Sequence, residues 1–216
     1  MKLTYKIGAL MALMMLPSSA ALYTVTTGSG ATATGFANSA GLAFQSNSTN
    51  GLPAGGISVG IFSTEDFTGV SSSAQLLSLF TAYSSGGTFT LAGPFGNKGF
   101  FSLAGNGVIT NSQFAGKNMF VLVGNNTNLS LANEFAVVKL SNTFTASDDA
   151  VSTPITVSFT TSNSTLLWGN TIADLKTTAT DSSVTPGFQT AVLVPEPSAV
   201  LLSVLGALGL LRRRRA

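Results

Sequence analysis

Two pairs of adjacent carboxylates, Glu65-Asp66 and Asp148-Asp149, are the acidic pairs in this sequence. Two carboxylates can hydrolyse a glycosidic bond when they face each other across a substrate. Adjacent residues in a strand point to opposite faces, however, and in a loop they are usually solvated. Calcium binding at Asp148-Asp149 is an alternative, but no Asp-x-Asp-x-Asp run supports it. We therefore predict no catalytic residue and no metal ligand.

The sequence contains neither histidine nor cysteine. This excludes zinc sites of the Cys/His kind, the Ser-His-Asp and Cys-His catalytic arrangements and any disulfide framework. The turn glycines are not followed by the Lys-Ser/Thr pair of a phosphate-binding loop. We expect a protein that is not an enzyme and that uses no cofactor.

Aromatic and asparagine side chains offer weaker candidates for binding. Trp168 could stack on a sugar together with Phe95, Phe100 and Phe101, although aromatic residues in a β-rich domain are more often core. A carbohydrate-binding module is therefore an alternative function, and a hydrolase is a third. Four asparagines match the glycosylation acceptor pattern, which arises often by chance in a chain so rich in Asn, Ser and Thr: Asn47, Asn125, Asn128 and Asn163.

Charge is scarce and unevenly distributed. Charged residues make up 8% of the 216 residues, and hydrophobic residues 44%, whereas about a quarter of an ordinary domain is charged. Six of the ten basic residues lie in the two terminal segments. Residues 22–193 keep four lysines against seven carboxylates, a formal charge of −3. No basic patch for nucleic acid is present in this sequence, so nucleic acid is not an expected partner.

The N-terminal segment, residues 1–21, has the pattern of a secretory signal peptide. Lys2 and Lys6 precede an apolar stretch at residues 7–16, and Pro17 follows it. The stretch is too short to span a bilayer, which takes about 20 residues. Small residues then provide a cleavage region: Ser19, Ala20 and Ala21.

The C-terminal segment, residues 194–216, combines three features. Pro195, Glu196 and Pro197 form an extended, exposed peptide, because two prolines around one residue do not fit a helix or a central strand. Residues 199–211 are uncharged and apolar, and about 13 helical residues cover about 20 Å of a hydrocarbon core of about 30 Å. An arginine cluster follows and should remain cytoplasmic: Arg212, Arg213, Arg214 and Arg215.

This order of Pro-Glu-Pro, apolar helix and arginine cluster resembles the PEP-CTERM sorting signal of Gram-negative bacteria, over about the last 22 residues. The resemblance implies processing near Pro195-Glu196-Pro197 by exosortase, a multi-pass membrane transpeptidase. A plain single-pass anchor is the alternative interpretation. Signal peptidase and exosortase are thus the expected partners, with an inner-membrane intermediate that passes to the cell surface or extracellular matrix. Because the family is associated with biofilm and extracellular polysaccharide, we expect a structural or adhesive protein.

Strand patterns dominate residues 22–193, which have a suitable length for one extracellular domain. Residues 119–123 and 135–140 are nearly continuous apolar runs, typical of central strands buried on both faces. Residues 57–62 predict another strand, and residues 155–160 alternate with one apolar face: Ile155, Val157 and Phe159. Asn106-Gly107 predicts a hairpin turn.

One helix is expected among these strands. Ser72 and Gln75 fit a capping box, and apolar residues at helical spacing continue toward Gly86: Leu76, Leu77, Phe80 and Tyr83. Residues 177–187 have the composition of a linker to the C-terminal segment. We predict a mainly β, antiparallel β-sandwich-like body with one short amphipathic helix. An N-terminal signal helix and a C-terminal transmembrane helix complete the prediction.

Overall fold

The structure is a computed structural model that describes residues 23–27, 34–45, 51–83, 87–88, 102–104, 113–144, 155–173, 175–176 and 187–193. The fold is mainly β with antiparallel sheets, as predicted, and one α-helix lies within the described part of the chain. The two predicted terminal helices, the cleavage region and the Pro-Glu-Pro motif lie outside the described residues, as does the Asn106-Gly107 turn.

A seven-stranded sheet forms the centre of the molecule, and all of its strand pairs are antiparallel. Five strands follow in the order β10-β8-β7-β3-β4, while β13 also pairs with β8 and β5 with β3. Their bounds are β3 Gly56–Phe62, β4 Phe80–Ala82, β5 Gly87–Thr88, β7 Asn118–Gly124, β8 Glu134–Thr143, β10 Ser164–Trp168 and β13 Ala191–Val192.

Two three-stranded sheets complete the β structure, and each contains one parallel pair. In the first, β1 pairs with β6 antiparallel and with β9 parallel; in the second, β12 pairs with β11 antiparallel and with β2 parallel. Their bounds are β1 Tyr23–Thr27, β2 Gly35–Ala37, β6 Ser102–Ala104, β9 Ile155–Phe159, β11 Asn170–Ile172 and β12 Gly187–Gln189. The prediction of an antiparallel body is therefore wrong for these two pairs.

The central sheet is buried on both faces, as the apolar runs predict. Side chains alternate along β7 and β8, so each strand contributes to two separate cores. The first core joins one face of the sheet to β1, β2, β9 and β12, and contains Val121 and Val138. The second core joins the other face to the helix and neighbouring loops, and contains Leu122 and Val137.

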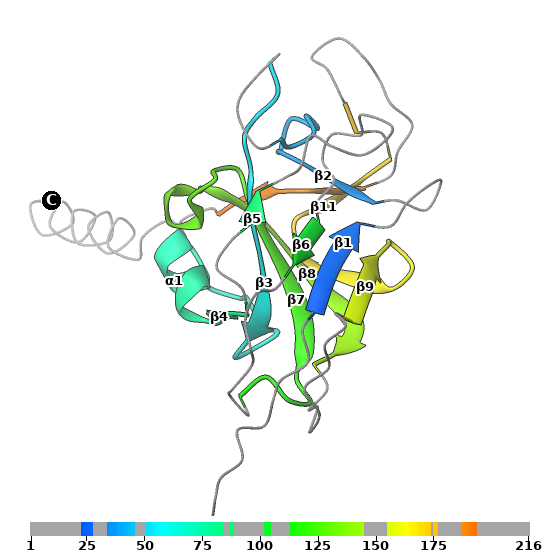
Figure 1. Cartoon of the computed structure of the whole chain (residues 1–216). Helices are drawn as coiled ribbons and strands as arrows, with labels where there is room; N and C mark the ends of the chain where they lie inside the picture. Colours follow the sequence, from blue (N-terminus) through cyan, green and yellow to red (C-terminus); the bar gives the residue numbers. More distant parts are fainter. Residues whose placement is uncertain are drawn as a thin grey trace, which may run out of the picture.

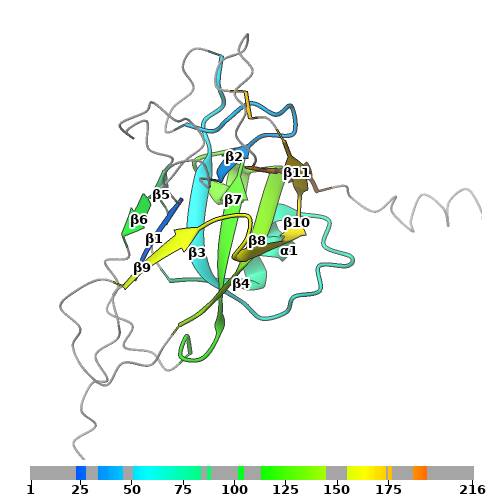
Figure 2. The same cartoon turned by 90° about the vertical axis from the view of Figure 1, so that its right-hand side faces the viewer.

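Figure 1 shows β1 and β9 on one side of β3, β7 and β8, and helix α1 on the other. In Figure 2 the β1 and β9 side faces the viewer, so that β9 lies in front of the central sheet and α1 behind it.

Strand β9 confirms the predicted alternation within the described residues. Val157 and Phe159 are buried in the first core, whereas Thr156 and Ser158 between them are exposed. Phe159 stacks on Phe36 with ring centroids 5.3 Å apart. The side chain of Ile155 lies outside the described part.

Helix α1 is shorter than the sequence predicts: it spans Ser73–Ser78. Ser72 is the N-cap, and its hydroxyl accepts a hydrogen bond from the backbone N–H of Gln75 at 3.3 Å. The chain then turns into β4, so Phe80 packs in the second core and Tyr83 in the first. The helical spacing of these two aromatics was thus misleading, because residues three apart in extended backbone point to opposite faces.

Residues 187–193, which precede the C-terminal segment, belong to the fold. Gly187 begins β12 and so belongs to the second small sheet rather than to a linker, while residues 177–186 lie outside the described part. Leu193 follows β13; it is buried in the second core and donates its backbone N–H to the carbonyl of Asn133 at 3.1 Å. The body therefore holds the chain to within two residues of Pro195.

Candidate functional site

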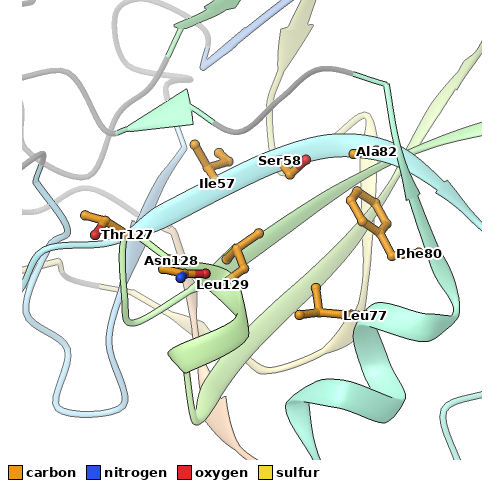
Figure 3. A pocket seen from close by; sticks show the side chains of 8 residues that line it. All are labelled: Ile57, Ser58, Leu77, Phe80, Ala82, Thr127, Asn128 and Leu129. Atoms are coloured by element: carbon orange, nitrogen blue, oxygen red, sulfur yellow. The ribbon is translucent and has the colours of Figure 1, made fainter.

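A pocket of about 510 Å³ lies on the helix-covered face of the central sheet. Figure 3 shows β3 along one side, α1 opposite it, β4 at one end and the loop after β7 at the other. Its volume falls in the range of about 300–1,000 Å³ that is typical of small-ligand sites. The lining residues are Ile57, Ser58, Leu77, Phe80, Ala82, Thr127, Asn128 and Leu129.

Small residues lie along the part of β3 that borders this pocket. Gly56, Ser58 and Gly60 occupy alternate positions, so they share the face of the strand that the pocket covers. A Cβ at Gly56 would meet the carbonyl oxygen of Thr127 at 2.8 Å, and a Cβ at Gly60 would meet the ring of Phe80 at 2.8 Å. The two glycines therefore let the loop and β4 approach β3 closely on either side of Ser58.

The apolar part of the pocket comes from three elements. Leu77 of α1, Phe80 of β4 and Leu129 of the 3-10 helix η2 (Leu129–Leu131) point into the space beneath Ser58 (Figure 3). All three are half-buried and pack against the second core. The Phe80 ring packs against the ring of Phe62, with centroids 4.9 Å apart.

The polar part of the pocket lies at the loop end. Asn128 caps η2: its Oδ1 accepts hydrogen bonds from the backbone N–H of Ser130 at 3.1 Å and from the Ser130 hydroxyl at 2.8 Å. This pairing orients the side-chain amide and directs Nδ2 away from the cap. Thr127 and Ser58 add two hydroxyls to the lining. No charged side chain lines the pocket, so its polar groups are an amide and hydroxyls.

The acidic pair Glu65-Asp66 does not form a shared site. Lys139 Nζ lies 2.6 Å from Glu65 Oε1, and Asn118 Nδ2 donates to the same oxygen at 3.0 Å. Hydrogen bonding to Lys139 lowers the pKa of Glu65. The backbone N–H of Thr68 donates to Asp66 Oδ1 at 2.9 Å, and hydrogen bonds from Thr68 lower the pKa of Asp66. Each carboxylate thus stabilises its own part of an exposed loop.

The carboxylate of Glu134 joins three segments. It accepts hydrogen bonds from the backbone N–H of Ser39 at 2.9 Å, from the Ser39 hydroxyl at 2.6 Å and from the Thr190 hydroxyl at 2.8 Å. Glu134 begins β8, and Thr190 lies between β12 and β13. This carboxylate therefore fastens the last strands of the body to the central sheet.

The remaining candidate residues from the sequence either do not meet in one site or lie outside the described residues. Trp168 is half-buried against the second core, and its Nε1 donates to the carbonyl of Ala191 at 3.5 Å. Asn125 and Asn163 are held by hydrogen bonds to Asn133 and to the Ser158 carbonyl. Outside the described residues are Asn47, Phe95, Phe100, Phe101, Asp148 and Asp149, as well as all the residues of the two terminal signals.

Sequence reasoning missed the pocket because its residues look like ordinary core. Leu77 and Phe80 share one face of the helix that the sequence predicts, and Ser58 lies within a predicted strand. The alternating Gly56, Ser58 and Gly60 are the signal that could have indicated it. Small residues on one face of a strand leave either room for a close backbone approach or a cavity, and β3 has both.

The described residues contain neither a metal-binding cluster nor a membrane-spanning helix. No group of three or more Asp, Glu, His or Cys side chains there could hold a metal ion. No helix in the described ranges is long and apolar enough to cross a membrane. Comparison of the chain with protein-family models, curated proteins and solved structures returned no match.

Proposed function

We propose that this chain is an exported, non-enzymatic cell-surface or extracellular-matrix protein with a structural or adhesive role. Its C-terminal segment would act as a PEP-CTERM sorting signal, recognised by an exosortase-type transpeptidase after signal peptidase removes residues 1–21. The order of Pro195-Glu196-Pro197, apolar stretch and arginine cluster carries the proposal. An inner-membrane intermediate would precede release to the surface or matrix.

The extent of the folded body supports this division of the chain. Tyr23 is 2% exposed and Leu193 is 6% exposed, and they belong to the two cores of the body. Cleavage after Ala20 or Ala21 and processing at Pro195-Glu196-Pro197 would leave both residues in place. We further propose a sandwich-like body, in which the two small sheets pack on one face of the central sheet through the first core.

Intact-mass spectrometry of the extracellular protein tests the processing. We expect a mass that lacks residues 1–21 and the arginine cluster. Replacing both Pro195 and Pro197 with Ala should retain the C-terminal segment, whereas Ser198→Ala, a neighbouring change outside the motif, should be processed normally. An extracellular form that still carries Arg212 to Arg215 would overturn the proposal.

A further inference from the structure

The pocket beside β3 combines an apolar wall with neutral polar groups. Phe80, Leu77 and Leu129 provide the wall, while Asn128 and Thr127 provide an amide and a hydroxyl at the loop end. A charged ligand would lose hydration there without meeting an opposite charge in the lining. A wholly apolar ligand would remove water from the amide and the hydroxyl without replacing their hydrogen bonds. The lining therefore favours a ligand that is neutral and has both an apolar and a hydroxylated surface.

We propose that this pocket binds one neutral sugar unit of a carbohydrate chain. A pyranose ring presents C–H groups on its face and hydroxyls around its edge. The C–H face can pack on the Phe80 ring, because aromatic faces carry partial negative charge. Asn128 Nδ2 can donate to a sugar hydroxyl, while the hydroxyl of Thr127 can either donate or accept.

The pocket is organised before any ligand enters. Asn128 is fixed by its two hydrogen bonds to Ser130, and Phe80 is supported by Phe62. The Ser73 hydroxyl donates to the carbonyl of Ser130 at 3.4 Å, which connects α1 to η2, and both of these elements contribute lining residues. Such preorganisation reduces the entropy cost of binding. The inference deepens the adhesive part of the proposed function and rests on it only for the source of the carbohydrate.

Binding of the full-length chain to an array of neutral oligosaccharides tests the site, followed by titration calorimetry with the glycan that binds best. Ala82→Leu should fill the pocket and weaken binding at least tenfold. Thr81→Leu is the matched control, because Thr81 is exposed on the same strand and does not line the pocket; its dissociation constant should stay within twofold of the original.

Asn128→Asp provides a second variant that should keep the fold. The carboxylate retains the oxygen that caps η2 but replaces the Nδ2 donor, so we expect at least tenfold weaker binding. The original chain has an uncharged lining, so its dissociation constant for the glycan should change less than twofold when NaCl rises from about 0.05 to 0.5 M.

Three results would overturn the inference: no neutral glycan is bound, Ala82→Leu binds as tightly as the original chain, or affinity falls steeply with salt. These results are independent of the mass measurement. A processed protein that binds no glycan would reject the pocket and retain the sorting proposal, and a glycan-binding protein that keeps its arginine cluster would do the reverse.

Discussion

Glu65 and Lys139 form an ion pair that attaches the loop before α1 to β8. The pair is close, at 2.6 Å, but the side chain of Glu65 is 45% exposed and that of Lys139 is 29% exposed. Solvent therefore screens much of their attraction, and exposed pairs contribute about 0–1 kcal/mol. The carboxylate lies in one of the acidic pairs that the sequence offers as candidates, and the structure shows it in a stabilising role.

Glu65→Gln should lower the free energy of unfolding by less than about 1 kcal/mol at pH 7. The pKa of Glu65 is lowered in the folded state, so its contribution is present above the ordinary value of 4.5 and is lost as the pH falls through the folded pKa. The difference from the original chain should therefore disappear well below pH 4.5. Urea denaturation at neutral and acidic pH measures this.

A double-mutant cycle with Lys139→Gln separates the pair from effects of each single change. A coupling free energy that is absent at pH 7, or one that remains unchanged at acidic pH, would contradict the assignment. High salt should reduce the coupling, because the charges are partly exposed.

At the scale of elements, the contact between β3 and β4 depends on Gly60. A Cβ at this position would meet the carbonyl oxygen of Thr81 and the ring of Phe80. The backbone oxygen cannot move without displacing β4 from β3, so Gly60→Ala should cost at least about 2 kcal/mol of unfolding free energy. Denaturant unfolding measures the loss.

Gly69→Ala is the matched control for this substitution. Gly69 has a φ of +79° and nothing within 4 Å of an added Cβ. Its substitution carries backbone strain alone, about 1–2 kcal/mol. If Gly60→Ala proved no more destabilising than Gly69→Ala, then β4 would not be held against β3 as tightly as the structure shows.

The sequence predicts the strands of the central sheet because an uninterrupted apolar run indicates a buried strand in almost any surroundings. Continuous apolar runs at residues 119–123 and 135–140 are stable only when both faces are covered, and both faces are. The predicted helix is too long because Phe80 and Tyr83 have helical spacing, although they lie in extended backbone and face the two different cores. Tertiary packing selects the extended conformation. Tyr83 lies in the first core, where its hydroxyl accepts a hydrogen bond from the backbone N–H of Tyr23 at 3.2 Å.

At the scale of the whole molecule, the arrangement of the small sheets was beyond sequence reasoning. Tyr23 pairs with Ile155 and Gly35 with Gly187, both in parallel register and both across most of the chain. Parallel pairing needs a long crossover and leaves no local turn signal. The pocket was equally hidden, because its lining residues come from β3, α1, β4 and the loop after β7. Within a single stretch of sequence, only the small residues along β3 indicate the pocket.

Leu193 follows the last described strand, so its substitution tests how far the cooperatively folded body extends toward the C-terminus. Leu193 is 6% exposed in the second core, whereas Val192 beside it is 47% exposed. Leu193→Ala should cost about 2–5 kcal/mol of unfolding free energy, and Val192→Ala should cost less than about 0.5 kcal/mol. Equally small effects of the two substitutions in denaturant unfolding would show that Leu193 is not part of the cooperative body. The expected difference would show that the cooperative body extends at least to Leu193, the last residue that the structure describes before the Pro-Glu-Pro motif.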